Sequence, residues 1–157
     1  MKTKLDASDK IFEVVSLASL VSTVLIIGIA IPGLSDVIPC HFDLSGVPNG
    51  YGSKYVLWTI VAVSLFIYML TGILNMFPES FNYPSQKNDK ESQYKLGAKL
   101  MRSLRACILF FITILTLIMV RSAQTGSAKD AFWLIGILPI LLIANFAWFA
   151  VKWKKIN

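Results

Sequence analysis

Four stretches of this chain contain no charged residue, and they constrain its fold more than any other feature. The stretches cover residues 14–35, 55–78, 106–120 and 131–151. A lipid bilayer has a hydrocarbon core about 30 Å thick, which a helix of about 20 residues crosses at 1.5 Å per residue. Three stretches reach that length, and the third is bracketed by Arg105 and Arg121, whose long side chains can extend to the interface. The sequence therefore predicts four transmembrane helices.

The overall composition agrees with this interpretation. The 157 residues are 55% hydrophobic, above the usual share for soluble proteins, and the mean hydropathy is +0.65. We expect an all-α protein, an integral membrane four-helix bundle that forms a single transmembrane domain over residues 1–157. The expected helices lie at about 11–32, 54–77, 90–121 and 131–152. Pro139 is expected to kink the last of them.

The distribution of basic residues predicts the orientation in the membrane. Twelve of the fifteen lie on one side, in the two tails and around residues 87–105, whereas the other side holds Lys54, Arg121 and Lys129. By the positive-inside rule, both termini and the loop 78–89 are cytoplasmic, and residues 33–53 form an outer loop. The net charge of +6 is then a topology signal. We expect the lipid bilayer, and no nucleic acid, as the partner of these charges.

The outer loop has an unusual composition. Residues 38–54 contain the single histidine of the chain, two prolines and three glycines, which impose particular backbone angles. His41 and Asp43 are two residues apart, so an extended backbone would point both to one face. They either hydrogen-bond to each other and to the loop backbone, or bind a ligand. The candidate ligand- or partner-binding residues of this loop are His41, Phe42, Asp43, Pro48, Asn49, Tyr51 and Lys54.

The sequence predicts neither a metal site nor a catalytic centre. A zinc site normally needs three or four protein ligands, and the chain has one histidine. Phosphate loops, paired catalytic carboxylates, zinc-protease motifs and nucleophile elbows are all absent from the sequence. Cys40 and Cys107 are expected on opposite sides of the membrane, too far apart for a disulfide. We therefore expect a protein that is not an enzyme and has no cofactor.

Polar residues inside the helices form a second candidate site. Ser64, Tyr68, Thr71 and Asn75 recur at i, i+4, i+7 and i+11 and share one face of the second helix, and Asn145 could meet Asn75 from the fourth. Either such residues pack helices together, at about 0.6 kcal/mol per contact, or they line a path for a substrate or ion. The central spans contain no charge, which argues against a pump. Further hydroxyl faces are Ser16, Ser19 and Thr23 on the first helix and Thr113 and Thr116 on the third.

The loop motif resembles the signature of a known family. Its residues are Ile38-Pro39-x-His41-Phe42-Asp43-x-x-Gly46-x-Pro48-Asn49-Gly50-Tyr51-Gly52-Ser53-Lys54. They are similar to an uncharacterised bacterial membrane domain that also forms the N-terminal part of SdpI-type immunity proteins. This resemblance implies a multi-pass protein of the bacterial plasma (inner) membrane with an extracytoplasmic motif loop. It also implies an extracellular peptide as the ligand of His41–Lys54, and a cytoplasmic regulator as the partner of the basic region Lys87–Arg105.

The expected function is therefore a binding, immunity or signal-relay module. One alternative is a transporter or channel-like subunit that uses the polar face of the second helix. Another is a structural subunit of a larger membrane complex. The oligomeric state stays open at this point.

Overall fold

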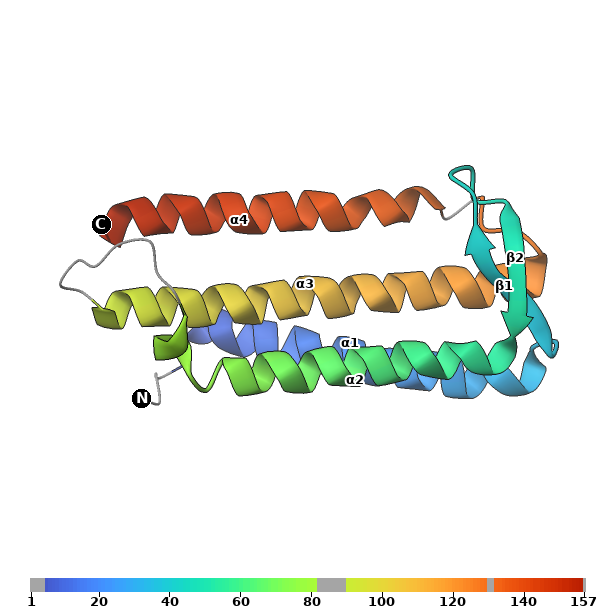
Figure 1. The fold of residues 1–157 in the computed structure, drawn as a ribbon, viewed down its shortest axis with the longest axis horizontal. Coiled ribbons are helices and arrows are strands. Elements are labelled where there is room, and N and C mark those ends of the chain that lie inside the picture. The colour runs from blue at the N-terminus through green and yellow to red at the C-terminus, as the bar shows by residue number, and fades with distance from the viewer. Residues whose placement is uncertain (1–4, 82–89, 130–131, 157) are drawn as a thin grey trace.

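A computed structural model describes residues 5–81, 90–129 and 132–156. Within these residues the chain forms four long helices and one antiparallel β-hairpin (Figure 1). The elements are α1 (Ala7–Ala30), β1 (Val37–Phe42), β2 (Pro48–Ser53), α2 (Leu57–Leu74), α3 (Lys90–Thr125) and α4 (Ile137–Ile156). All four helices are long and apolar enough to cross a membrane. The prediction of a multi-pass membrane protein is confirmed at this level.

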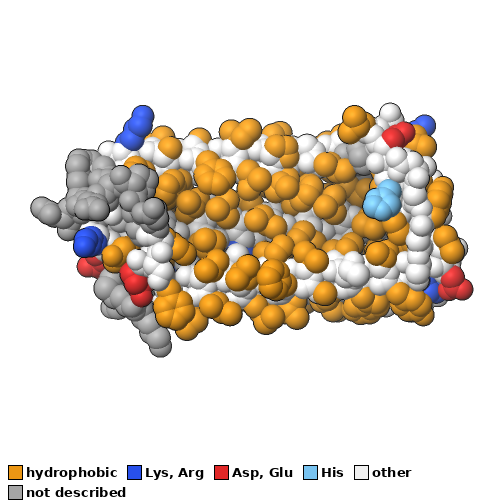
Figure 2. Space-filling view, viewed as in Figure 1, with side chains coloured by type: hydrophobic (Ala, Val, Ile, Leu, Met, Phe, Trp, Pro, Cys, Tyr) orange, Lys and Arg blue, Asp and Glu red, His pale blue; other side chains and the backbone are white. Residues whose placement is uncertain are grey.

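The side chains on the surface agree with burial in lipid. Figure 2 shows hydrophobic side chains along the visible face of the helices, with charged ones gathered toward the two ends. Both chain termini lie at one end of the molecule, and the hairpin lies at the other (Figure 1). We call these the termini end and the hairpin end.

Local sequence signals determine where the helices begin. Asp6 caps α1, because its Oδ1 accepts the N–H of Asp9 at 2.9 Å while Asp9 Oδ2 accepts the N–H of Asp6 at 3.1 Å. Ser53 caps the 3₁₀ turn that leads into α2. Pro139 is the third residue of α4, where a helical N–H has no intrahelical partner in any case. Pro139 therefore lies in the first turn of α4 and not in its interior, and a 3₁₀ turn at Phe132–Gly136 precedes α4.

The four long helices that we expected are present, and they differ in how many neighbours each one has. α1 and α3 run parallel to each other and antiparallel to α2 and α4, and α1, α2 and α3 pack together (Figure 1). α4 packs mainly against α3, and its side chains at Ile140, Ile143 and Val151 are exposed. Lipid tails are as apolar as these side chains, so a membrane helix gains little by covering them with protein. The fold is a three-helix core with a fourth helix on its flank.

Hydroxyl side chains bring α1 and α3 close together. Ser16, Thr23 and Thr116 are fully buried. Thr23 Oγ1 lies 3.1 Å from Thr113 Oγ1, and Thr113 also donates to the carbonyl oxygen of Ser19 at 3.0 Å. Small side chains allow helix backbones to approach closely, and their hydroxyls hydrogen-bond across the interface. These residues pack helices together, as one of the two sequence interpretations expects.

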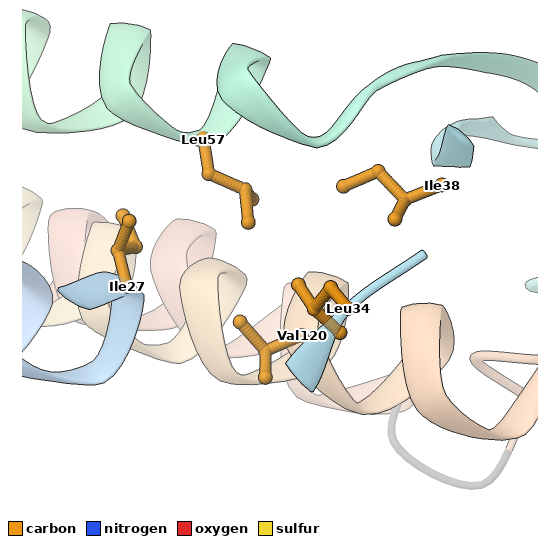
Figure 3. Packing of buried hydrophobic residues seen from close by; sticks show 5 residues of the cluster. All are labelled: Ile27, Leu34, Ile38, Leu57 and Val120. Atoms are coloured by element: carbon orange, nitrogen blue, oxygen red, sulfur yellow. The ribbon is translucent and has the colours of Figure 1, made fainter. Parts of the chain in front are cut away.

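The expected outer loop is largely a β-hairpin. Residues 33–53 include both strands, so the protein is not all-α. The side chain of Ile38 on β1 is completely buried, and it packs in a cluster whose members come from α1, α2, α3 and the segment after α1 (Figure 3). The cluster comprises Ile27, Leu34, Ile38, Leu57 and Val120. Through this cluster the hairpin is fixed to the ends of three helices.

Replacing Ile38 with alanine should loosen the hairpin from the helices. Loss of a fully buried isoleucine side chain costs about 2–5 kcal/mol, so we expect a lower Tm for Ile38→Ala in detergent. The matched control is Val37→Ala, because the neighbouring Val37 is 63% exposed. Equal Tm values for the two variants would show that the hairpin is not anchored through Ile38.

Candidate functional site

The turn of the hairpin is shaped by Asp43. Its Oδ1 accepts the backbone N–H groups of Ser45 at 2.8 Å and Val47 at 2.9 Å. Gly46 has a φ of +76°, a left-handed conformation that favours glycine. β1 ends at Phe42, so Asp43 lies in the turn rather than on an extended strand. Asp43 therefore does not share a strand face with His41, contrary to our expectation, and its carboxylate holds the turn.

Two glycines of β2 make room for side chains of β1. A Cβ atom on Gly50 would lie 3.0 Å from Cβ and Cδ2 of His41, and one on Gly52 would lie 3.1 Å from Sγ of Cys40. The imidazole thus covers Gly50, and it is exposed on the molecular surface (Figure 2). Among the described residues no hydrogen bond joins His41 to Asp43. The hydrogen-bonded pair that the sequence suggested is not formed.

Lys54 closes the base of the hairpin. Its Nζ lies 3.1 Å from Oδ1 of Asp36 and donates to the carbonyl oxygen of Leu34 at 3.1 Å. Its backbone N–H donates to the carbonyl oxygen of Asp36 at 3.0 Å. These contacts join the end of β2 to the segment that precedes β1. Lys54 therefore has a structural role within the protein.

Three of the candidate loop residues remain exposed. Asn49 and Tyr51 alternate with half-buried residues along β2, so they point to the outward face of the hairpin. His41 is exposed over Gly50. Phe42 and Pro48 pair across the strands and are half-buried. His41 lies on the same face of the hairpin as Gly50, whereas Asn49 and Tyr51 point to the opposite face. We call these three exposed side chains, on the two faces of the hairpin, the hairpin surface.

The serine and threonine hydroxyl groups on the polar face of α2 form their hydrogen bonds within the same helix. Ser64 donates to the carbonyl oxygen of Ile60 at 2.7 Å, and Thr71 donates to that of Ile67 at 2.6 Å. Such bonds to the preceding turn are usual for hydroxyl residues inside a helix.

Asn75 and Asn145 contact α3 at different places and do not meet. The side-chain amide of Asn75 is oriented so that both of its polar atoms form hydrogen bonds. Its nitrogen donates to the carbonyl oxygen of Ala98 at 3.2 Å, and its oxygen accepts from Nε of Arg102 at 3.1 Å. Asn145 of α4 accepts from Oγ of Ser103 at 3.2 Å. Both side chains join helices, and Asn145 is not part of the α2 polar face.

Sequence reasoning missed a set of ion pairs between α1 and α3 at the termini end. Three acids at the start of α1 face three bases of α3 in parallel order, and we call these six residues the charge ladder. Lys99 pairs with Asp6, Nη1 of Arg102 lies 3.2 Å from Oδ1 of Asp9, and Nη2 of Arg105 lies 2.5 Å from Oε2 of Glu13. Nε of Arg102 also lies 3.4 Å from Oε1 of Glu13. The ladder contains three positive and three negative charges, so it is neutral.

The inner rungs of the ladder are buried except at Glu13, whose side chain is 34% exposed. The side chains of Asp9 and Arg102 are 8% and 9% exposed, and that of Arg105 is 3% exposed. The ring of Tyr68 lies 4.8 Å from the Arg105 guanidinium, a cation–π contact. Arg105 Nε has no hydrogen-bond partner in the part of the chain that the structure describes. Buried charges like these are tolerated only when paired.

The outermost rung lies at the protein surface. The hydrogen bond from Lys99 holds the pKa of Asp6 well below its usual range, and the N–H of Asp9 acts in the same direction. Lys99 also donates to Oγ of Ser8 at 3.1 Å. Asp6 thus has two functions at once, since it caps α1 and pairs with α3.

The ladder changes the interpretation of the basic region Lys87–Arg105. Lys99, Arg102 and Arg105 point toward α1, where they pair with the three acids of the ladder. Lys87 lies outside the described residues. The sequence signal for the ladder is the helical spacing of acids at 6, 9 and 13 against bases at 99, 102 and 105. This spacing predicts ion pairs only when α1 and α3 are known to be parallel neighbours.

The described residues contain two free thiols and no cluster of metal ligands. Within residues 5–81, 90–129 and 132–156 there is no group of three His, Cys, Asp or Glu side chains that could hold a metal ion. Cys40 and Cys107 are both free thiols, as expected from their separation.

Part of the chain matches a known protein family. A family described as "Domain of unknown function (DUF1648)" matches residues 18–65, which include the second half of α1, the hairpin and the first half of α2. The matched part carries the motif that resembles an uncharacterised membrane domain. No curated protein and no solved structure matches the chain.

Removing Arg102 should destabilise the helix core strongly. Arg102→Ala leaves the buried carboxylate of Asp9 without its partner, and breaking a buried pair in this way costs about 3–5 kcal/mol. The control is Lys95→Ala, which removes an exposed pair with Glu91 (2.6 Å) on the same helix. Such surface pairs contribute about 0–1 kcal/mol. We expect a much lower Tm in detergent for Arg102→Ala than for Lys95→Ala, and similar values would mean that the ladder does not stabilise the fold.

Proposed function

We propose that this protein is a bacterial plasma-membrane protein that binds an extracytoplasmic ligand through the hairpin surface. One observation carries the proposal. The hairpin is fixed to the helices by the buried Ile38 and by Lys54, yet His41, Asn49 and Tyr51 remain exposed on it. A rigid scaffold loses little conformational freedom on binding, and tyrosine is enriched among residues that dominate binding energy. The hairpin therefore has the properties of a preformed recognition surface.

Charge supports an outward orientation of the hairpin. Basic residues are concentrated at the termini end, including Lys10, Lys152, Lys154 and Lys155. The positive-inside rule counts Lys and Arg near the ends of the spans, and acidic residues contribute little to it. The neutrality of the charge ladder therefore does not weaken the orientation signal. On this basis the termini are cytoplasmic and the hairpin is outside.

Contacts within the fold support a relay from the hairpin to the cytoplasmic end. The backbone N–H of Ala128, just after α3, donates to the carbonyl oxygen of Gly46 in the hairpin turn at 3.2 Å. α3 then extends without interruption from Lys90 to Thr125 and carries the basic half of the charge ladder. A displacement of the hairpin by its ligand would act on α3 and, through it, on the ladder.

The resemblance to SdpI-type proteins supports a ligand class and a partner. It favours an extracellular peptide as the ligand and a cytoplasmic regulator as the receiver of the signal. Because the ladder arginines are internal, the exposed Lys152, Lys154 and Lys155 at the end of α4 are better placed to contact such a regulator. The hydroxyls of α2 bond within their own helix, so they favour this binding module over the transporter alternative.

A growth assay tests the proposal. A strain lacking the gene should be inhibited by secreted peptides in medium conditioned by the parent strain, and the wild-type gene should restore growth. The double variant His41→Ala/Tyr51→Ala should fail to protect, and the tolerated peptide dose should fall at least about tenfold, because hot-spot side chains contribute more than about 1.4 kcal/mol. Immunoblots of isolated membranes would verify that the variant inserts normally.

The matched control is Val37→Ala, which removes an exposed hairpin side chain outside the hairpin surface. It should protect as well as the wild type. Full protection by the double variant, or normal growth of the deletion strain in the conditioned medium, would refute a peptide-binding role for the hairpin.

A further inference from the structure

A groove opens between α1 and α3 near the hairpin end, with a volume of about 540 Å³. Its walls are the apolar side chains of Leu25, Ile26 and Ile29 on α1 and Val120 on α3. Two polar residues mark its ends, since Ser22 lies deep along α1 and Gln124 lies near the hairpin end of α3. The volume is within the range of about 300–1,000 Å³ that is typical of ligand sites.

The length of the groove matches one leaflet of a bilayer. It extends from Ser22 on α1 to Gly33 at the end of the 3₁₀ turn that follows α1, a distance of about 16 Å at about 1.5 Å per residue. Half of a hydrocarbon core is about 15 Å thick. At its deep end, Thr23 and Thr113 are in contact at 3.1 Å, which brings α1 and α3 together at the depth of Ser22. The groove therefore extends from the hairpin end to about the middle of the membrane.

We propose that this groove binds one acyl chain of a phospholipid from the leaflet on the hairpin's side. Leu25 and Ile29 are exposed on the protein surface, so the groove opens sideways toward lipid. The span 14–35 contains no charged residue, and the lining offers an acyl chain van der Waals contacts from two helices. The Gln124 amide at the mouth can both donate and accept hydrogen bonds at the level of the lipid ester groups.

This site is independent of whatever the hairpin binds. A bulk lipid chain is already in an apolar environment, so its binding gains little from the hydrophobic effect. Preference for the groove must come from the fit between the chain and the two helices. A side chain that fills the groove should therefore remove the bound lipid without changing the rest of the surface.

Native mass spectrometry of protein purified in mild detergent tests the site. The wild type should retain one phospholipid per chain. Gly33→Phe should reduce the retained fraction at least about tenfold, because Gly33 lines the groove and has open space around its Cβ position. Gly28→Phe is the matched control, because Gly28 on α1 also has open space around it but does not line the groove. It should retain lipid like the wild type.

A second variant and a second measurement keep the test decisive if Gly33→Phe does not fold. Ala30→Phe fills the same groove from the last turn of α1. In nanodiscs, a phospholipid with a photoreactive acyl chain should label peptides containing Leu25, Ile29 and Gln124 in preference to the exposed face of α4. Uniform labelling, a wild type that carries no lipid, a retained free fatty acid, or a cross-linked dimer through α1 would each overturn the proposal.

Discussion

The contact between α1 and α3 is the interaction on which the other elements depend. Lipid provides no hydrophobic force between helices, so membrane helices associate through close packing, hydrogen bonds and ion pairs. α1 and α3 use all three, with the charge ladder at the termini end, hydroxyl contacts such as Thr23–Thr113 in the middle, and apolar packing around Ile27 and Val120 at the hairpin end. α2 packs against this pair, and α4 packs on the outer side of α3.

The hairpin is held by the same pair of helices together with the start of α2. α1 leads through a short 3₁₀ turn at Ile31–Gly33 toward β1, and the connection after α3 bonds to the hairpin turn through Ala128. The hairpin at one end and a buried ion network at the other are thus joined by two parallel helices. Asp43, Gly50 and Lys54 maintain the form of the hairpin, so its exposed residues are not needed for that purpose.

The sequence predicted what local chemistry determines. Long uncharged spans predicted the four helices. The hairpin was harder to predict, because Pro39, Gly50 and Gly52 are residues that strands usually lack. The structure explains the two glycines, since the side chains of His41 and Cys40 occupy the space next to them. The charge ladder and the flanking position of α4 depend on which helices are neighbours, and no spacing within one helix specifies that.

The orientation of the hairpin is the point on which the functional proposal rests. Single cysteines at Asn49 in the hairpin surface and at Lys155 near the end of α4, introduced in a Cys40→Ser/Cys107→Ser background, would report it in whole cells. A membrane-impermeant maleimide should label Asn49→Cys before lysis and Lys155→Cys only after lysis. Labelling of Lys155→Cys in intact cells, with Asn49→Cys protected until lysis, would place the hairpin in the cytoplasm and contradict an extracytoplasmic binding role.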